Sequence, residues 1–221
     1  MARHPEDALL KTATLGLLAW ALTAALLAGC GAQGGSRGQT VFNTCVPCHG
    51  ENGGGVTRLH TPAIAGLPEW YIARELRHFA TDVRGAHPDD MEGHRMRPMA
   101  RTLWHPGDLD AVAHYVASMP AVPAPHTLPK SDVANGQMRF TTICMTCHGL
   151  DGKGNVATGA PKLVGQWDWY LVAQLDKFHS GMRGTNPADT LGAQMRAMSL
   201  TLEDSTAIHN VVSYIETLPT R

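Results

Sequence analysis

Two stretches of the chain carry the pattern C-x-x-C-H. They comprise Cys45, Cys48 and His49 in the first stretch, and Cys144, Cys147 and His148 in the second. Two thiols at this spacing reach both vinyl groups of a haem, and the histidine that follows directly points its imidazole at the iron. A structural zinc or redox site, the alternative for such cysteine pairs, does not explain a histidine after each pair. The sequence therefore predicts two covalently bound haems c, each with one histidine as an iron ligand.

A second iron ligand is expected from a methionine near the end of each half. Met99 and Met198 each lie 50 residues after the histidine of their motif. A thioether suits ferrous iron and raises the reduction potential relative to a second histidine. We therefore predict Met99 and Met198 as the ligands. Met96 and Met195, three positions earlier, are the alternative pair and are more typical of flexible packing against the haem.

Histidine competes with methionine for the iron of the first half. Six histidines follow the first motif, namely His60, His78, His87, His94, His105 and His114. His94 is nearest to the methionines, but its counterpart in the second half is Ala193, so histidine ligation would require the two halves to differ. Most of these histidines are expected to be solvated surface residues.

Other side chains have supporting roles around each haem. Pro62 and Pro161 each lie 13 positions after the motif histidine and are candidates to accept a hydrogen bond from its second ring nitrogen, which fixes the tautomer. Six residues are weaker candidates for hydrogen bonds to the haem propionates, because aromatic residues at helical spacing are more often core. They are Trp70, Tyr71, Trp169, Tyr170, Arg84 and Arg183.

The two motifs belong to a repeat of about half the chain. Cys45 and Cys144 are 99 positions apart, and the same offset superposes Pro62 on Pro161, Trp70-Tyr71 on Trp169-Tyr170, Arg84 on Arg183 and Met99 on Met198 without a gap. A match of this length indicates a duplicated domain. We predict haem domains at residues 36–120 and 132–221, joined by a proline-rich spacer at residues 121–131 that is unsuited to a helix.

Each half reads as helices and loops, which predicts an all-α fold with two tandem domains. A short helix with Gly38 or Gly136 precedes the motif, where the glycine permits a close helix crossing. A middle helix follows Pro68 in the first half, and the segment with the methionines is expected to be a loop. Closing helices begin near Asp108 and Asp204 and end before Pro120 and Pro219. A haem in each half would supply much of the core of so small a unit.

The N-terminal segment predicts export and membrane attachment. Basic residues are followed by a mostly apolar run over residues 12–28, which ends in Leu27-Ala28-Gly29-Cys30. This ending resembles the bacterial lipobox, so residues 1–29 are expected to be a signal peptide, Cys30 the lipidated N-terminus and residues 30–35 a tether. An uncleaved anchor helix is the alternative. Either reading places the globular part on the periplasmic side of a bacterial membrane.

Overall composition excludes few functions. The formal net charge is −1, which implies no strong positive electrostatic field that would attract nucleic acid. All five cysteines have an assignment, four to the haems and Cys30 to lipid, which leaves none for a disulfide.

The motifs, the offset and the segment from Pro161 to Gln166 together resemble class I cytochromes c, and more narrowly the dihaem cytochrome c4 family, here in a lipoprotein-like variant. The resemblance implies two domains with facing haem edges, histidine and methionine ligands on both irons, and electron delivery to terminal oxidases or reductases. The first half departs from the pattern, with Leu67 in place of Gln166 and Glu75 in place of Gln174.

We therefore interpret the protein as an electron carrier and not as an enzyme. With both axial positions of each iron filled by the protein, outer-sphere electron transfer is possible while substrate binding at iron is obstructed. The expected partners are a quinol-oxidising complex (quinol-cytochrome c reductase) and a terminal oxidase or reductase. The alternatives are a dihaem peroxidase-like enzyme and a permanent electron-entry subunit of an oxidase or reductase complex.

Overall fold

A computed structural model describes residues 36–220, and each predicted domain within them is built from helices and connecting loops. The first half contains α2 (Arg37–Phe42), α3 (Val46–His49), the 3-10 turn η1 (Thr57–Leu59), α4 (Glu69–Ala80), α5 (Met91–Arg101) and α6 (Asp108–Ser118). The second half contains α7 (Val133–Arg139), the π-helical turn η2 (Phe140–Cys144), α8 (Met145–His148), η3 (Val156–Thr158), α9 (Asp168–His179), α10 (Thr190–Ser199) and α11 (Ser205–Ile215). Between residues 36 and 220 the β pairing is limited to two isolated bridges, so the all-α prediction is confirmed. The expected signal peptide, Cys30 and the tether lie outside the described residues.

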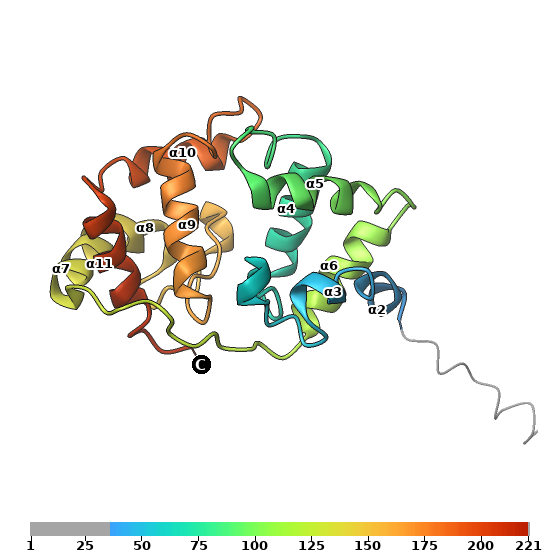
Figure 1. Cartoon of the computed structure of the whole chain (residues 1–221), viewed down its shortest axis with the longest axis horizontal. Coiled ribbons are helices and arrows are strands. Elements are labelled where there is room, and N and C mark those ends of the chain that lie inside the picture. The colour runs from blue at the N-terminus through green and yellow to red at the C-terminus, as the bar shows by residue number, and fades with distance from the viewer. Residues whose placement is uncertain (1–35, 221) are drawn as a thin grey trace, which may run out of the picture. The chain divides into compact units, whose positions relative to one another are not determined.

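The first and last helices of each half cross closely, as the glycine pattern predicts. In Figure 1, α2 crosses α6 in the blue and light green part, and α7 crosses α11 in the yellow and red part. A Cβ atom added at Gly38 would lie 2.6 Å from the Tyr115 Cβ, and one at Gly136 would lie 2.5 Å from the Asn210 carbonyl carbon. Only glycine fits at these two crossings.

The middle helices α4 and α9 carry the apolar face that lines the interior of each half. Ile72 and Phe79 of α4 are buried, and so are Leu171 and Phe178 of α9. Their spacing of seven residues returns to the same helix face after two turns. Each helix packs against the closing helix of its own half, and each half has its own hydrophobic core cluster.

The methionine segments differ from the prediction of a loop, because both are helical. Met96 and Met99 lie on α5, and Met195 and Met198 lie on α10. Each helix starts at an aspartate that caps it: the Asp90 carboxylate accepts a hydrogen bond from the Gly93 N–H, and Asp189 does the same for Gly192. N-terminal capping by aspartate satisfies an amide that the helix leaves unpaired, which explains why these segments continue as helices.

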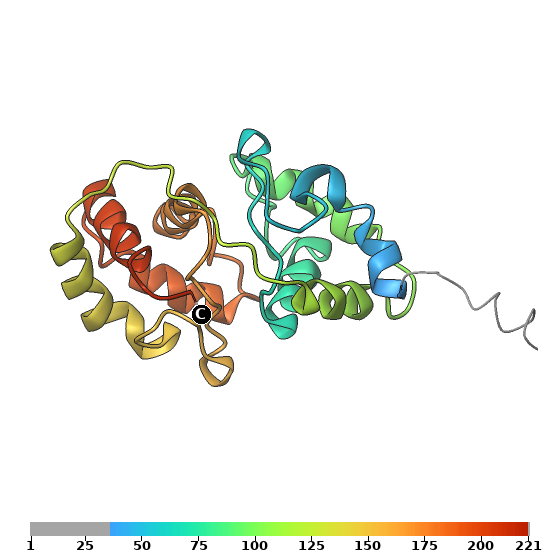
Figure 2. The same cartoon turned by 90° about the horizontal axis from the view of Figure 1, so that it is seen from below.

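The proline-rich spacer between the halves has the extended form that its composition predicts. Residues 120–132 contain no helix or strand, and Figure 2 shows this yellow-green segment as a drawn-out strap. Its later part is tied to the second half by Asp168, which is 1% exposed and accepts hydrogen bonds from the Thr127 hydroxyl and the Leu128 N–H. Over residues 36–220, no helix combines the length and apolar character that a membrane crossing requires.

Candidate functional site

The two C-x-x-C-H motifs form matching short helices, α3 and α8. Each motif histidine is the last residue of its helix, and the following glycine turns the chain away with a positive φ, 79° at Gly50 and 78° at Gly149. His49 is 6% exposed and His148 is 7% exposed. The turn therefore holds each imidazole inside its domain.

Both motif histidines are held by a backbone carbonyl, as predicted. His49 Nδ1 lies 3.1 Å from the Pro62 carbonyl oxygen, and His148 Nδ1 lies 2.9 Å from that of Pro161. A carbonyl oxygen only accepts, so Nδ1 carries the hydrogen and Nε2 keeps its lone pair. Burial also lowers the pKa of both histidines, although the carbonyl contact acts in the opposite direction. A neutral imidazole with a free Nε2 is the form that binds a metal.

The motifs face a largely apolar cavity of about 400 Å³. All four motif cysteines and both motif histidines line it. Apolar side chains complete the wall, including Ile72, Leu76 and Phe79 of the first half and Leu171, Leu175 and Phe178 of the second. This lining suits a flat apolar macrocycle with a few polar groups at its edge.

All four candidate methionines line the same cavity, whereas His94 is absent from its wall. Met99 is 40% exposed and Met198 is 42% exposed, and Met96 and Met195 are half-buried. The geometry therefore brings methionine and not His94 to the histidine-bearing cavity.

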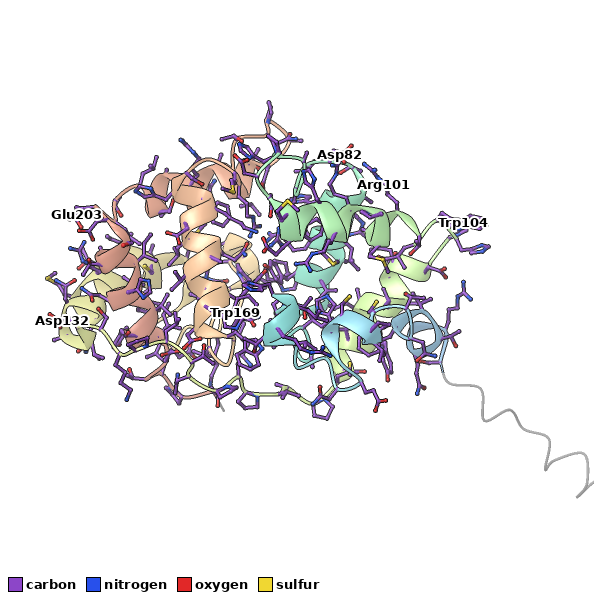
Figure 3. All side chains as sticks on the ribbon, viewed as in Figure 1. Asp82, Arg101, Trp104, Asp132, Trp169 and Glu203 are labelled. Carbon is purple, nitrogen blue, oxygen red and sulfur yellow. The ribbon has the colours of Figure 1, made fainter. Side chains whose placement is uncertain are left out.

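Two further features fit a haem. Trp169, which is labelled in Figure 3, also lines the cavity. Its Nε1–H is buried and has no hydrogen-bond partner among the described residues. A buried donor without an acceptor is costly, so this group fits an acceptor supplied by a ligand, such as a propionate. Burial raises the pKa of the Cys144 thiol to about 11, and burial likewise raises that of Cys45 against a hydrogen bond with Thr44. None of the four motif cysteines is joined to another in a disulfide, so all of them remain available for thioether attachment.

Four of the remaining propionate candidates line the cavity, namely Tyr71, Arg84, Tyr170 and Arg183, whereas Trp70 is absent from its wall. Arg84 and Arg183 each lie over a phenylalanine of their own half, at 4.6 Å from the Phe79 ring centroid and 4.3 Å from that of Phe178. The Tyr170 hydroxyl accepts a hydrogen bond from Arg84 at 3.1 Å. Tyr71 is half-buried beside the same group, and its pKa is raised mainly by burial. Trp70 packs edge-on against Tyr71.

Sequence reasoning missed the polar contacts that join the two halves. Lys177 of α9 donates to the Asp90 carboxylate at 2.5 Å and to Glu92 at 2.8 Å. Gln166 holds both backbone groups of Ala63, since its Oε1 accepts from the amide at 3.0 Å and its Nε2 donates to the carbonyl at 2.8 Å. One signal was available: these positions break the repeat, because the residues that match Lys177 and Gln166 in the first half are His78 and Leu67.

Comparisons with known proteins agree with this architecture. The sequence model of the cytochrome c family matches residues 35–120 and 133–219. The chain is 32% identical over 179 residues to the thiosulfate dehydrogenase electron acceptor of Stutzerimonas stutzeri strain A1501, covering 76% of each. It is 27% identical over 191 residues to cytochrome c4 of Azotobacter vinelandii, covering 83% of this chain and 88% of the relative.

A solved structure shows the same fold. The crystal structure of reduced recombinant cytochrome c4 from Pseudomonas stutzeri matches with a TM-score of 0.63 and 29% identity, covering 82% of this chain and 97% of that one. The family match falls on both halves, each of which has its own C-x-x-C-H motif and carbonyl-held histidine. The chain therefore belongs to the cytochrome c family, as a dihaem class I member of the cytochrome c4 type with two covalently bound haems c, and its function is electron transfer.

Proposed function

We propose that this protein is a membrane-tethered periplasmic electron carrier that passes single electrons from a donor complex to a terminal oxidase or reductase. Bound haem supplies a one-electron iron centre whose potential depends on its axial ligands. The observation that carries the proposal is the pair of buried histidines, each held by a proline carbonyl and both facing the same methionine-lined cavity. With a histidine and a methionine of the protein as the two ligands of each iron, binding of a substrate at iron would be obstructed.

The proposed haem ligands are specific residues of the two halves. Thioether attachment is assigned to the four motif cysteines, and the axial ligands are His49 with Met99 and His148 with Met198. Met99 and Met198 are preferred over Met96 and Met195 because each stands four residues before a leucine that precedes the closing helix, and because their side chains are more exposed and have room to reorient. Replacement of Met99 and Met198 by alanine is expected to change the iron coordination seen in optical and electron paramagnetic resonance spectra. The matched variants Met96→Ala and Met195→Ala are expected to keep it, and the opposite result would exchange the two assignments.

The donor is open to two proposals. A quinol-oxidising complex suits a respiratory carrier, whereas the similarity to a thiosulfate dehydrogenase electron acceptor favours a dehydrogenase of a sulfur compound. Stopped-flow reduction of the purified holoprotein by a quinol-cytochrome c reductase and by a thiosulfate dehydrogenase separates them. The physiological donor is expected to reduce both haems within the turnover time of the donor enzyme.

A carrier is distinguished from the enzyme and subunit alternatives by two measurements. A peroxidase-like enzyme needs an iron position that an external ligand can reach, so carbon monoxide should bind the reduced protein readily if the enzyme reading holds. A carrier with both positions filled is expected to show no such spectral change. A permanent electron-entry subunit would copurify with an oxidase or reductase in a fixed ratio from detergent-solubilised membranes, and a mobile carrier would not.

Membrane attachment is assigned to Cys30, after removal of residues 1–29. A diacylglyceryl group on this thiol would hold the carrier near its membrane partner and raise the effective concentration there. The variant Cys30→Ser is expected to move the holoprotein from the membrane fraction to the soluble periplasmic fraction. Mass spectrometry of the mature N-terminus distinguishes the lipid anchor from a retained helix, because only the cleaved and lipidated form begins at Cys30.

A further inference from the structure

Four polar side chains, two from each half, form one buried cluster between the domains. We define the inter-domain cluster as Glu75, Arg84, Gln174 and Arg183. Arg84 donates to the Glu75 carboxylate at 2.6 Å and to the Gln174 carbonyl at 2.9 Å. Arg183 donates to Gln174 at 2.8 Å and to Glu75 at 3.1 Å. Each arginine thus binds the acceptor of its own half and the acceptor of the other half.

The cluster is symmetric in position but not in charge. Arg84 matches Arg183 at the offset of 99, and Glu75 matches Gln174 at the same offset. The two arginines donate to corresponding acceptors, so exchanging the halves leaves the hydrogen-bond pattern unchanged. The exchange alters only the acceptor, because the first half has a carboxylate where the second has a neutral amide.

The carboxylate of Glu75 is ionised at neutral pH and screened poorly by solvent. The side chains of Arg84, Arg183 and Glu75 are 9%, 8% and 11% exposed. Burial raises the pKa of Glu75, but Arg84, Arg183 and Arg74 outweigh burial and lower it to about 2. Arg74 also contacts the Glu75 carboxylate at 3.3 Å, so several cations surround a single anion.

All four cluster residues also line the cavity that holds the motif cysteines and histidines. An oxidised haem carries one more positive charge than a reduced one, and a buried negative charge nearby stabilises the oxidised form. We propose that Glu75 tunes the reduction potentials of both haems, holding them lower than two neutral acceptors in the cluster would. This inference rests on the two bound haems and the electron-transfer function, and it is independent of the donor, of the acceptor and of the lipid anchor.

The test uses the holoprotein and three variants of the cluster. Glu75→Gln gives the cluster two amides, Gln174→Glu gives it two carboxylates, and the double variant moves the single carboxylate to the other half. Both midpoint potentials are measured by optical spectroelectrochemical titration at pH 7. Glu75→Gln is expected to shift both potentials upward and Gln174→Glu to shift both downward. The double variant is expected to return their mean toward that of the wild type, because the cluster regains one anion.

A matched control and a fold check make the outcome decisive. Glu69→Gln removes a carboxylate from the same helix at a side chain that is 51% exposed, and it is expected to leave both potentials unchanged. Circular dichroism and the reduced optical spectrum identify any variant that has lost its fold or its iron ligands. If Glu75→Gln does not fold, Gln174→Glu alone still decides the sign. The proposal would be overturned if both potentials stayed unchanged in folded Glu75→Gln and Gln174→Glu, or if they shifted in the reverse direction. Either result would show that the charge at this cluster does not lower the reduction potentials of the haems.

Discussion

The crossing of α7 and α11 provides a quantitative test of how tightly this fold is built. Gly136→Ala would place a methyl group 2.5 Å from the Asn210 carbonyl carbon and 3.1 Å from the Tyr214 Cβ. Ordinary van der Waals contact begins near 3.4 Å and the Asn210 carbonyl oxygen lies closer still than the carbonyl carbon, so the two helices must move apart by roughly 1.5 Å. The nearest atoms belong to backbone, which cannot rotate away as a flexible side chain would.

The expected loss of stability follows from two opposing effects. Alanine in a helix is favoured over glycine by about 1 kcal/mol. Forcing an extra methyl group into a well-packed core costs about 1–3 kcal/mol, and the upper part of this range applies where backbone must shift. Separation of α7 from α11 also exposes part of a helix in which Ile208, Val211 and Val212 are at most 2% exposed. We therefore expect Gly136→Ala to lower the free energy of unfolding by about 2 kcal/mol.

The assay is guanidinium-induced unfolding of the holoprotein, followed by circular dichroism. Gln137→Ala, at an exposed position of the same helix, is the control and is expected to change stability by less than about 0.5 kcal/mol. Gly38→Ala should reproduce the loss in the first half, where the added atom meets Tyr115 at 2.6 Å. A gain of about 1 kcal/mol in Gly136→Ala would refute the reasoning, because only helix propensity would then operate.

Three other perturbations have definite expectations. Lys177→Met should lower the free energy of unfolding in urea by about 3 kcal/mol, because it leaves Asp90, which is 1% exposed, without its cation; a loss below about 1 kcal/mol would show that the pair is not needed. Trp104→Glu should change the thermal midpoint little, since Trp104 is 73% exposed, points away from the neighbouring ribbon in Figure 3 and corresponds to Glu203 in the second half; a clear drop would reveal packing not described above. The pKa of Glu75 is lowered from 4.5 to about 2 on folding, so its contribution is fully present above pH 4.5 and is lost as pH falls toward 2. The free energy of unfolding of Glu75→Gln, measured in urea at several pH values, should therefore fall by roughly 3 kcal/mol less across this window than that of the wild type. The same pH dependence in both proteins would contradict the lowered pKa of Glu75.

Local chemistry made much of the fold readable from the sequence. The C-x-x-C-H motifs and the offset of 99 indicated two haem domains, and proline positions bounded the middle and closing helices. The predicted roles of Pro62 and Pro161 are confirmed by their hydrogen bonds to the motif histidines. The prediction worked because the covalent chemistry of haem attachment and the turn after it constrain residues that are close in sequence.

The parts that sequence reasoning missed depend on contacts between distant segments. A repeat shows which residues are equivalent, but it does not show that Arg84 of one half binds Gln174 of the other, 90 positions away. The helical state of the methionine segments was also missed. There, the caps at Asp90 and Asp189 outweigh the irregular appearance of stretches that contain glycine, arginine and, in the first half, Pro98.

The hydrogen bonds between the halves reach the segments that orient the motif histidines. Gln166 of the second half hydrogen-bonds both backbone groups of Ala63, the residue after Pro62. Arg74 of the first half donates a hydrogen bond at 2.9 Å to the carbonyl of Gly159, two residues before Pro161. Each half thus stabilises the backbone segment whose proline carbonyl orients the motif histidine of the other half. Cutting the chain in the spacer would not release two independent cytochromes, because each fragment would lose an external support for its own iron ligand.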